Sequence, residues 1–529
     1  HVSIYGSGAV ATGLKIRNNT FIDGGNYAIS LTASSGSSAT GLEITNNTFT
    51  NTYSGIFLQY YDAVTIRGNT IKGSYMLDYG MYLNYCDGAN VIEDNYIYAP
   101  DMTYGIRLNQ CHGTSGNRAT IVNNLISVED HGLYLHNSNY YQDVYYNTVK
   151  VLDQYALYAN GLNNDIFKNN IFYSESTINP AVYFSSTSGF TADYNAIYSS
   201  YSYPVYVSGS KSFSQYQSVT GNGTNSINAD PLFDTDSTLI PQAFPLDNRG
   251  ISLFNITDDM NGVTRSTTTP DMGAIEFTLS GTALSGTYTI GSGGNFATFD
   301  SVKQAFVLYG ISSAVTFNIL PGTYTEKLTL GNIPGASATN TVTFQSQDAN
   351  ADSVIWENTG SSSTANYVVQ LNGARHVQFK HITFKGDNSS YSRKIVFGSG
   401  ADSVTIDSSK FLGYQGANSN NHASIFGSGV YTPGLKIKNS TFTNGGNYAI
   451  SLTASSSSAA TGLEITNNTF TNTYSGIYLQ YYDAVTIRGN TIKGSYMNNY
   501  GINLTYCDGA NIIEDNYIYA PDMNYGIYL

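Results

Sequence analysis

The chain has 529 residues, of which only 11% are charged, and its 23 basic and 37 acidic residues give a net charge of −14. This composition excludes a long coiled coil, whereas a hydrophobic content of 41% is too high for a disordered chain. The acidic balance disfavours a nucleic acid partner, and no apolar run approaches the ~18 residues that a membrane-spanning helix requires. We therefore expect a folded, β-rich segment without a membrane span.

Residues 1–108 recur almost unchanged as residues 422–529. At this offset of 421, 87 of the 108 positions are identical. Self-similarity at a fixed period is the signature of repeat architectures. Because the second copy is still running at residue 529, we expect the chain to be a window on a tandem array of large, near-identical domains in a much larger protein.

A shorter period runs through residues 1–228, where a phrase similar to Ile-x-Asn-Asn-Thr-Phe recurs every 22 to 29 residues. The second Asn of this phrase falls at Asn19, Asn47, Asn69, Asn95, Asn124, Asn147, Asn170 and Asn195. Gly-Ile-x-Leu phrases lie between these positions, and the short segments alternate apolar and polar residues. Units of this size cannot bury an apolar face alone, so they are predicted to stack into a β-solenoid. We expect the Asn column at a corner, where the amides bond to each other and to the backbone.

Equivalent positions of successive rungs lie ~4.8 Å apart in such a solenoid, so columns of the sequence can be read as stacks. One column contains Asp62, Asp87, His112 and Asn139, and its copy contains Asp483 and Asp508. Each Asp can close its own turn by accepting hydrogen bonds from backbone amides. The alternative is calcium bound by Asp62 with Asp87 and by Asp483 with Asp508, because hard cations take carboxylate oxygens. Calcium is the one cofactor that the sequence suggests.

The cysteines indicate a second column. Cys86 and Cys111 each lie six residues after the Gly of a Gly-Ile-x-Leu phrase, and Cys507 is the copy of Cys86. We therefore expect Cys86 and Cys111 to stack in consecutive rungs. Both a cross-rung disulfide and a pair of free thiols in the core are compatible with this spacing.

Residues 229–278 are expected to close the first domain, which would span residues 1–278. Their phrases are Asp230-Pro231-Leu232-Phe233, Asp259-Met260-Asn261-Gly262 with Arg265, and Pro270-Asp271-Met272-Gly273-Ala274-Ile275-Glu276-Phe277. Turn formation and calcium binding are both open to Asp234, Asp236, Asp258 and Asp259. A short linker is predicted at residues 279–285, followed by the next domain at residues 286–529.

This next domain opens with Gly291-Ser292-Gly293-Gly294-Asn295-Phe296, and Pro321-Gly322-Thr323-Tyr324-Thr325-Glu326 follows. Between these phrases, residues 299–309 have the pattern of a short amphipathic helix. Its apolar face consists of Phe299, Val302, Ala305 and Phe306. We expect this helix to cap the solenoid, with Asp300 and Ser301 supplying the N-terminal capping groups.

The rungs and these phrases resemble the right-handed parallel β-helix of the pectin-lyase-like superfamily over nearly the whole chain. The opening phrases are similar to the entry of pectinesterases, and the closing phrases are similar to those of bacterial secreted β-helix proteins. The resemblance implies an all-β fold: a right-handed parallel β-helix with a short N-terminal capping helix, tandemly repeated.

This superfamily includes pectate lyases, pectinesterases and polygalacturonases, but a fold by itself does not transfer an activity. The pectinesterase phrases Gln-Asp-Thr and Asp-Phe-Ile-Phe-Gly do not occur, and neither do the polygalacturonase phrases Asn-Thr-Asp and Gly-His-Gly. We therefore predict no catalytic residue and favour a protein that is not an enzyme.

The near-identity of the copies favours a structural and adhesive protein, because a stalk gains reach and repeated display from each added unit. The chain resembles the large secreted surface proteins of Bacteroidota, which implies an extracellular location at the cell surface. The expected partners are surface glycans or proteins, and neighbouring copies of the repeat in a homo-oligomeric filament. Amphipathic rings suited to such contacts are found in the pairs Tyr60-Tyr61, Tyr140-Tyr141 and Tyr145-Tyr146. The alternatives are a polysaccharide lyase or hydrolase and a carbohydrate-binding module.

Overall fold

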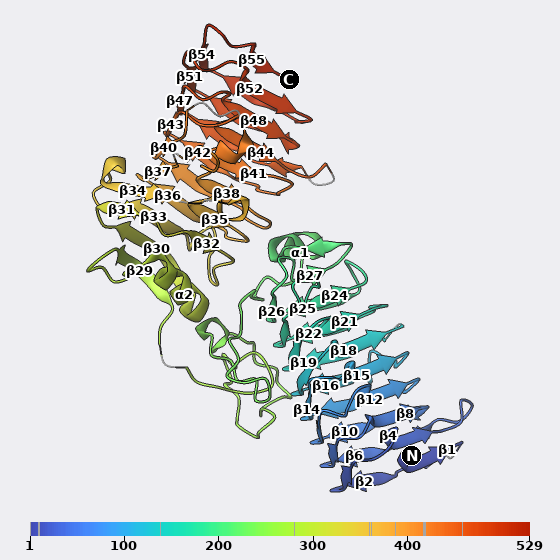
Figure 1. The fold of residues 1–529 in the computed structure, drawn as a ribbon. Coiled ribbons are helices and arrows are strands. Elements are labelled where there is room, and N and C mark those ends of the chain that lie inside the picture. Colours follow the sequence, from blue (N-terminus) through green and yellow to red (C-terminus); the bar gives the residue numbers. More distant parts are fainter. Residues whose placement is uncertain are drawn as a thin grey trace. The chain divides into compact units, whose positions relative to one another are not determined.

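The computed structural model describes all residues except 1, 9, 10, 138, 280, 359, 361, 387, 416–418, 457 and 458. It divides into two compact units, residues 1–281 and 282–529 (Figure 1). This division falls within the predicted linker at 279–285, of which residue 280 lies outside the described residues.

Unit 1 is a parallel β-solenoid in which successive rungs add a strand to each of three sheets. Sheet 1 consists of β1 (Val2–Ser7), β4 (Tyr27–Thr32), β8 (Ser54–Gln59), β12 (Tyr79–Asn84), β15 (Tyr104–Asn109), β18 (His131–His136), β21 (Leu157–Ala159), β24 (Val182–Phe184), β27 (Val205–Tyr206) and β28 (Ser210–Lys211). Sheet 2 consists of β2 (Lys15–Arg17), β6 (Glu43–Thr45), β10 (Thr65–Arg67), β13 (Val91–Glu93), β16 (Ala119–Val122), β19 (Gln142–Tyr145), β22 (Asp165–Lys168) and β25 (Phe190–Asp193). Sheet 3 consists of β3 (Thr20–Ile22), β7 (Thr48–Thr50), β11 (Thr70–Lys72), β14 (Tyr96–Ala99), β17 (Leu125–Val128), β20 (Thr148–Val151), β23 (Ile171–Ser174) and β26 (Ala196–Ser199).

Unit 2 has the same architecture (Figure 1). Sheet 4 consists of β29 (Leu284–Ile290), β30 (Ile311–Ile319), β33 (Val342–Ser346), β36 (Val377–Lys380), β39 (Thr405–Asp407), β42 (Lys436–Lys438), β46 (Glu464–Thr466), β50 (Thr486–Arg488) and β53 (Ile512–Glu514). Sheet 5 consists of β31 (Gly322–Tyr324), β34 (Val354–Glu357), β37 (Thr383–Lys385), β40 (Lys410–Leu412), β43 (Thr441–Thr443), β47 (Thr469–Thr471), β51 (Thr491–Lys493) and β54 (Tyr517–Tyr519). Sheet 6 consists of β32 (Leu328–Leu330), β35 (Val369–Leu371), β38 (Ile395–Phe397), β41 (Ile425–Gly427), β44 (Ile450–Thr453), β48 (Ile477–Gln480), β52 (Tyr500–Thr505) and β55 (Tyr525–Tyr528).

The remaining elements are small. Two-residue strands pair as β5 (Ala39–Thr40) with β9 (Tyr61–Asp62) and as β45 (Ala460–Thr461) with β49 (Tyr482–Asp483). The helices are α1 (Phe213–Thr220), α2 (Phe299–Tyr309) and the short 3₁₀ helices η1 (Phe244–Leu246), η2 (Ala351–Ser353), η3 (Ser363–Ala365) and η4 (Asn420–His422). No helix among the described residues is long and apolar enough to cross a membrane.

The three-residue strands place one apolar side chain inside each rung. In sheet 2, Ile44, Ile66 and Ile92 are fully buried and stack in register, while the residues on either side of each point outward. A residue with positive φ, such as Asn46 or Asn123, then turns the corner into sheet 3. The predicted Asn ladder follows immediately: Asn95 Nδ2 donates to Asn124 Oδ1 at 2.9 Å, and the same oxygen accepts the Asn95 backbone N–H at 3.1 Å. The ladder prediction is therefore confirmed.

Helix α2 caps the start of unit 2 as predicted. Phe299, Val302, Ala305 and Phe306 are buried, and the helix packs against β29 and β32. The N-cap differs from the prediction: it is Thr298, whose hydroxyl accepts the Ser301 backbone N–H at 3.1 Å. The Ser301 hydroxyl completes this reciprocal cap.

Helix α1 covers the last rungs of unit 1 and is absent from the sequence-based predictions. Ser212 and Gln215 form a capping box at its start, and the buried Tyr216 packs against Phe184 with ring centroids 6.2 Å apart. This Ser-x-x-Gln pattern is a capping box that can be recognised in the sequence.

The closing segment, residues 229–278, adds no rung to the solenoid. It runs back along the outside of unit 1, over the corner between sheets 2 and 3. Asn123 Nδ2 donates to the Asp258 carbonyl, and Tyr146 donates its hydroxyl proton to the Ile251 carbonyl at 2.8 Å. The Ala274 backbone N–H donates to Thr148 Oγ1, also at 2.8 Å. Residues more than one hundred positions apart in the sequence are thereby joined.

Candidate functional site

The outer surface of sheet 1 has a column of side chains at its centre, and all of them except Ser30 are large. Register places one residue of every strand from β1 to β27 in this column, which we call the central column: Tyr5, Ser30, Phe57, Tyr82, Arg107, Tyr134, Tyr158, Tyr183 and Tyr206. Neighbouring rings stack closely, with centroids 4.5 Å apart for both Tyr134–Tyr158 and Tyr158–Tyr183. This separation follows from the spacing of adjacent strands. Because the rings cover each other's faces, their edges and hydroxyl groups are directed to the solvent.

A second column lies beside the first on the same sheet. Tyr79, Tyr104 and His131 occupy consecutive strands, and the Tyr79 and Tyr104 rings stack at 5.6 Å. Tyr155 continues this row next to His131 at 5.9 Å. We call the central column together with Tyr27, Tyr79, Tyr104, His131 and Tyr155 the aromatic face. Burial raises the pKa of Tyr79 and of Tyr134 to about 12, so these hydroxyls are neutral donors and acceptors at physiological pH.

Amide side chains follow on the other side of the central column. Asn109 Nδ2 donates to Asn84 Oδ1 at 2.7 Å, and Asn137 Nδ2 donates to Asn109 Oδ1 at 2.9 Å. The surface of sheet 1 therefore combines ring edges, hydroxyls and amides, which are groups that contact a polar and partly apolar ligand.

Arg107 is the cation of the aromatic face. Its guanidinium carbon lies 4.7 Å from the ring centroid of Tyr82 and 4.9 Å from that of Tyr104, and Tyr79 and Tyr134 complete the surroundings. Among the described residues, no carboxylate forms an ion pair with it within 4.0 Å. Asp78 lies at the edge of this group; burial raises the pKa of its carboxyl, while Arg107 and hydrogen bonds from Tyr79 and Ser54 act in the opposite direction.

His131 makes this face sensitive to acid. Its ring stacks on Tyr134 at 4.8 Å, and burial lowers its pKa from 6.5 to about 4. The unfolded chain therefore binds the proton on His131 more tightly than the folded chain does. The stability that neutral His131 contributes is present above pH ~6.5 and is lost as the pH falls toward ~4.

We expect His131→Phe to reduce the loss of unit 1 stability between pH 7 and pH 4.5, measured by denaturant unfolding. An unchanged pH dependence would contradict this assignment.

The tyrosine pairs singled out in the sequence lie largely elsewhere. Tyr61 and Tyr146 are buried in the core, and Tyr60 stacks on Tyr85 at 5.4 Å beyond the end of sheet 1. The sequence-based predictions did not include the residues of the aromatic face, although the sequence contains a pattern that marks them. The central column is the variable position of the Gly-Ile-x-Leu phrase, occupied by Phe57, Tyr82 and Arg107 in three successive rungs.

The predicted aspartate column forms a chain of backbone hydrogen bonds. Asp62 Oδ1 accepts the Asp87 N–H at 2.9 Å, and Asp87 Oδ1 accepts the His112 N–H at 2.8 Å. In the copy, Asp483 Oδ1 accepts the Asp508 N–H at 2.8 Å. The placement of Asn139 in this column was wrong: it is buried and accepts from the Cys111 N–H, one position away, because the longer loop of that rung shifts the register.

Calcium at Asp62 with Asp87 and at Asp483 with Asp508 stays a prediction. Within the described part of the chain, no three His, Cys, Asp or Glu side chains gather as a metal site. A melting temperature that rises with calcium and no longer does so in Asp87→Asn would support the prediction.

In the closing segment, Asp234 and Asp259 accept several backbone N–H groups and close turns.

The cysteine column is confirmed. The Cys86 backbone N–H approaches Cys111 Sγ at 3.4 Å, which places the two residues in consecutive rungs. Both are buried free thiols, and burial raises the pKa of Cys111. The core column thus contains two small apolar groups and no disulfide.

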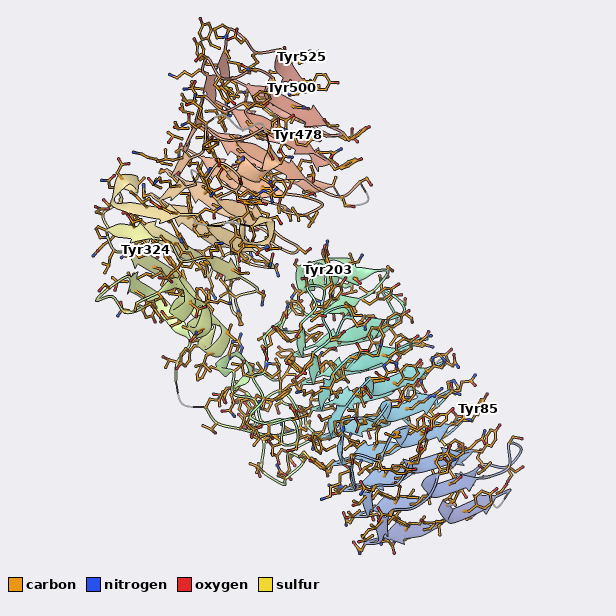
Figure 2. All side chains as sticks on the ribbon, viewed as in Figure 1. Tyr85, Tyr203, Tyr324, Tyr478, Tyr500 and Tyr525 are labelled. Carbon is orange, nitrogen blue, oxygen red and sulfur yellow. The ribbon has the colours of Figure 1, made fainter. Side chains whose placement is uncertain are left out.

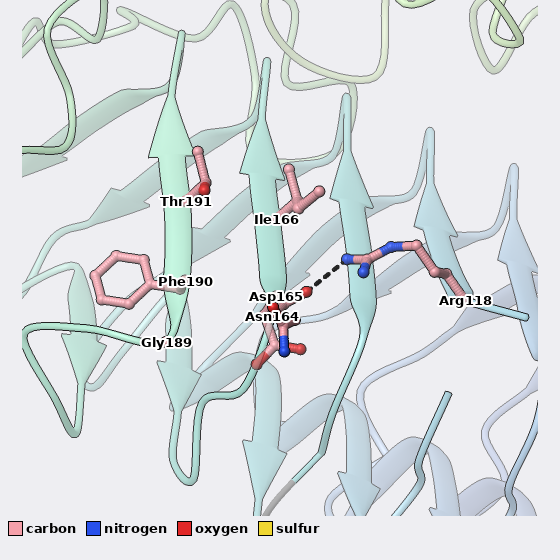
Figure 3. Close-up of a pocket in the computed structure, with 7 residues that line it drawn as sticks. All are labelled: Arg118, Asn164, Asp165, Ile166, Gly189, Phe190 and Thr191. Carbon is pink, nitrogen blue, oxygen red and sulfur yellow. Dashed lines mark hydrogen bonds between the residues drawn. The ribbon is translucent and has the colours of Figure 1, made fainter. Parts of the chain in front are cut away.

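A polar depression of about 310 Å³ opens at the edge of sheet 2 (Figure 3). Its lining residues are Arg118, Asn164, Asp165, Ile166, Gly189, Phe190 and Thr191. Arg118 donates to the Asn164 carbonyl and to Asp143 Oδ1, both at 2.7 Å, and Asp165 accepts the backbone N–H groups of Gln142 and Asn163. Burial raises the pKa of Asp165 to about 7. Since these charged groups are bound by the chain itself, the depression is a weaker candidate than the aromatic face.

Figure 2 shows the counterpart of the aromatic face in unit 2, where Tyr478, Tyr500 and Tyr525 lie on successive strands of sheet 6. Tyr500 and Tyr525 stack at 5.4 Å, as Tyr79 and Tyr104 do in unit 1. The candidate surface is thus repeated at the period of 421 residues.

These observations define the chain as an all-β, right-handed parallel β-helix protein. Residues 6–98 and 38–231 match the family described as periplasmic copper-binding protein (NosD), and residues 367–529 match the family described as right handed beta helix region. No curated protein matches the chain in sequence.

Seven chains of solved structures match this chain, and two of them do so at low identity and low TM-score. The pectin methylesterase from Aspergillus niger is 16% identical, with 46% of this chain and 81% of that chain covered and a TM-score of 0.32. The PL6 family alginate lyase AlyGC is 9% identical, with 97% of this chain and 96% of that chain covered and a TM-score of 0.25.

Proposed function

We propose that this chain is a segment of an extracellular tandem-repeat β-helix protein that attaches to surfaces by binding glycans through the aromatic face. The observation that carries this proposal is the central column, in which large side chains occupy eight of the nine strands from β1 to β27, the exception being Ser30. A solvent-facing surface with this many rings is unusual where solubility alone is required.

The arrangement suits an extended polymer. Tyrosine supplies a rigid amphipathic contact at a small cost in conformational entropy. The edges and hydroxyls recur at the strand spacing of ~4.8 Å, so a chain of repeating polar units can make the same contact on rung after rung. Repetition of the architecture in a second unit presents a further aromatic face on the same chain.

The setting of this function is the cell surface. The family described as periplasmic that matches unit 1 supports export from the cytoplasm. A filament of neighbouring copies would display many such faces along one chain. Unit 1 and unit 2 repeat the same sheet architecture, as this proposal requires.

The test is binding of the 529-residue chain to a glycan array and to insoluble polysaccharides. We expect the double variant Tyr158→Ala/Tyr183→Ala to weaken binding by at least tenfold, about 1.4 kcal/mol. The matched control is Tyr173→Ala/Tyr198→Ala, which removes a stacked pair from sheet 3 in neighbouring rungs. The control should bind as wild type does.

Two outcomes would overturn the proposal. The first is a wild-type chain that binds no glycan, and the second is an equal loss in both double variants. The alternative function, a polysaccharide lyase or hydrolase, is tested in the same samples. Release of unsaturated or shortened oligosaccharides would favour that enzyme over an adhesin.

A further inference from the structure

The two sequence copies provide an internal comparison of the sheet surfaces. Of the 108 aligned positions, 21 differ, and nine of these lie beyond position 40. The nine pairs are Phe57/Tyr478, Leu77/Asn498, Asp78/Asn499, Met81/Ile502, Tyr82/Asn503, Asn84/Thr505, Val91/Ile512, Thr103/Asn524 and Arg107/Tyr528. Seven of them lie on the outer surface of sheet 1 or in the turns that lead into it; Met81 points into the core, and Val91 belongs to sheet 2.

Beyond position 40, the outer surfaces of the other two sheets differ only at Val91/Ile512 on sheet 2, an exchange of one apolar residue for another. Before position 40, Arg17/Lys438 on sheet 2 and Ile22/Thr443 on sheet 3 also differ. In sheet 2, Glu43, Thr45, Thr65, Arg67 and Glu93 all recur identically at the offset of 421. In sheet 3, Thr48, Thr50, Thr70, Lys72, Tyr96 and Tyr98 do the same. Exposed positions tolerate substitution with little effect on stability on any sheet. Stability therefore does not explain why the differences beyond position 40 gather on sheet 1.

The substitutions change the chemistry of the face in a concerted way. Asp78 and Arg107 are both replaced by neutral residues, Asn499 and Tyr528. In unit 1 the guanidinium lies among four tyrosine rings. In unit 2 its position is taken by the Tyr528 ring, 5.5 Å from those of both Tyr500 and Tyr525.

The replacement of Tyr82 changes the shape of the face. Its counterpart Asn503 lies between Tyr478 and Tyr528 in the column and donates to the Tyr448 hydroxyl at 3.4 Å. A ring is thus exchanged for a short amide at the centre of the surface. The aromatic frame remains, since Tyr27, Tyr79 and Tyr104 recur as Tyr448, Tyr500 and Tyr525.

We propose that this surface determines specificity and that the two copies bind different glycans: an anionic one at Arg107 in unit 1, and a neutral one at the corresponding face of unit 2. This inference rests on the proposed glycan-binding function. The guanidinium offers charge-assisted hydrogen bonds to a carboxylate or sulfate. The second face keeps hydroxyl and amide groups without a formal charge. A tandem array would thereby hold several ligands along one chain.

The test exchanges the face of unit 1 for that of unit 2 in the 529-residue chain, with the variant D78N/Y82N/N84T/R107Y. This variant should fold, because the same residues are already accommodated on an almost identical scaffold in unit 2. The probes are uronate and sulfated oligosaccharides, which separate the two anions, and neutral hexose oligosaccharides. The affinity for the anionic probes should fall at least tenfold, whereas the affinity for the neutral probes should stay the same or increase.

The matched control is Arg67→Tyr, which removes one cation from the unchanged surface of sheet 2. It should leave both probe classes bound as in the wild type. Retention of anionic binding by the exchanged variant, or an equal loss for both probe classes, would overturn the inference. If the wild type binds glycans and the exchange has no effect, only this inference fails. If the wild type binds none, the proposed function itself fails.

Discussion

Replacement of Asn124 by alanine is expected to destabilise unit 1 by about 3 kcal/mol or more, since each buried polar group left without a partner costs about 1–3 kcal/mol. Asn124 Nδ2 donates to the Ile92 carbonyl and to Asn147 Oδ1, each at 2.9 Å. Its Oδ1 accepts from both the backbone and the side chain of Asn95. The alanine variant removes these four bonds from three consecutive rungs, while Asn147 Oδ1 keeps the Asn124 backbone N–H and Asn95 Nδ2 keeps the Ile66 carbonyl.

The measurement is denaturant unfolding followed by circular dichroism and by tryptophan fluorescence. The chain has one Trp, the buried Trp356 of unit 2, so fluorescence reports on that unit. Asn124→Ala should lower the midpoint seen by circular dichroism and leave the fluorescence midpoint unchanged. Thr65→Ala, an outward-facing change on β10, is the control. A midpoint for Asn124→Ala equal to that of the control would show that the ladder contributes little to stability.

Loss of Arg265 is expected to release the closing segment from unit 1. Its side chain is 2% exposed, and Nη1 pairs with Glu276 Oε2 at 3.3 Å. Nη2 donates to Asn123 Oδ1 and to the Gly273 carbonyl, and the guanidinium lies 4.0 Å from the Tyr146 ring centroid. Removing one partner of a buried ion pair costs about 3–5 kcal/mol because the other charge is left uncompensated.

Limited proteolysis and amide exchange over residues 229–278 measure this effect. Arg265→Ala should be cleaved and exchanged faster in that segment, while the rungs stay protected. Arg249→Ala, which changes an exposed residue of the same segment, should behave as wild type. Adding Glu276→Gln to Arg265→Ala should restore part of the protection. Equal protection in Arg265→Ala and Arg249→Ala would refute the role of the buried pair.

The sequence by itself determined the solenoid and its repeat. Three local patterns indicated it: the period of the Asn phrase, the alternation of apolar and polar residues along each short segment, and the glycine-rich phrase that opens the second domain. Each pattern follows from how one rung is built. For the same reason the Asn ladder, the Cys86–Cys111 column and the apolar face of α2 could be predicted: a fixed spacing in the sequence becomes a fixed stack in space.

Only the tertiary structure decided which surface residues lie together. The aromatic face joins Tyr27 to Tyr206 across many rungs, and loops of different length separate its members, so its register depends on how each rung closes. Loop length also moved Asn139 out of the aspartate column. The burial of Tyr61 and Tyr146 and the return of residues 229–278 along one corner depend on long-range packing. Local pattern fixes the geometry of a rung, whereas the sum of contacts between rungs decides which of its side chains meet the solvent.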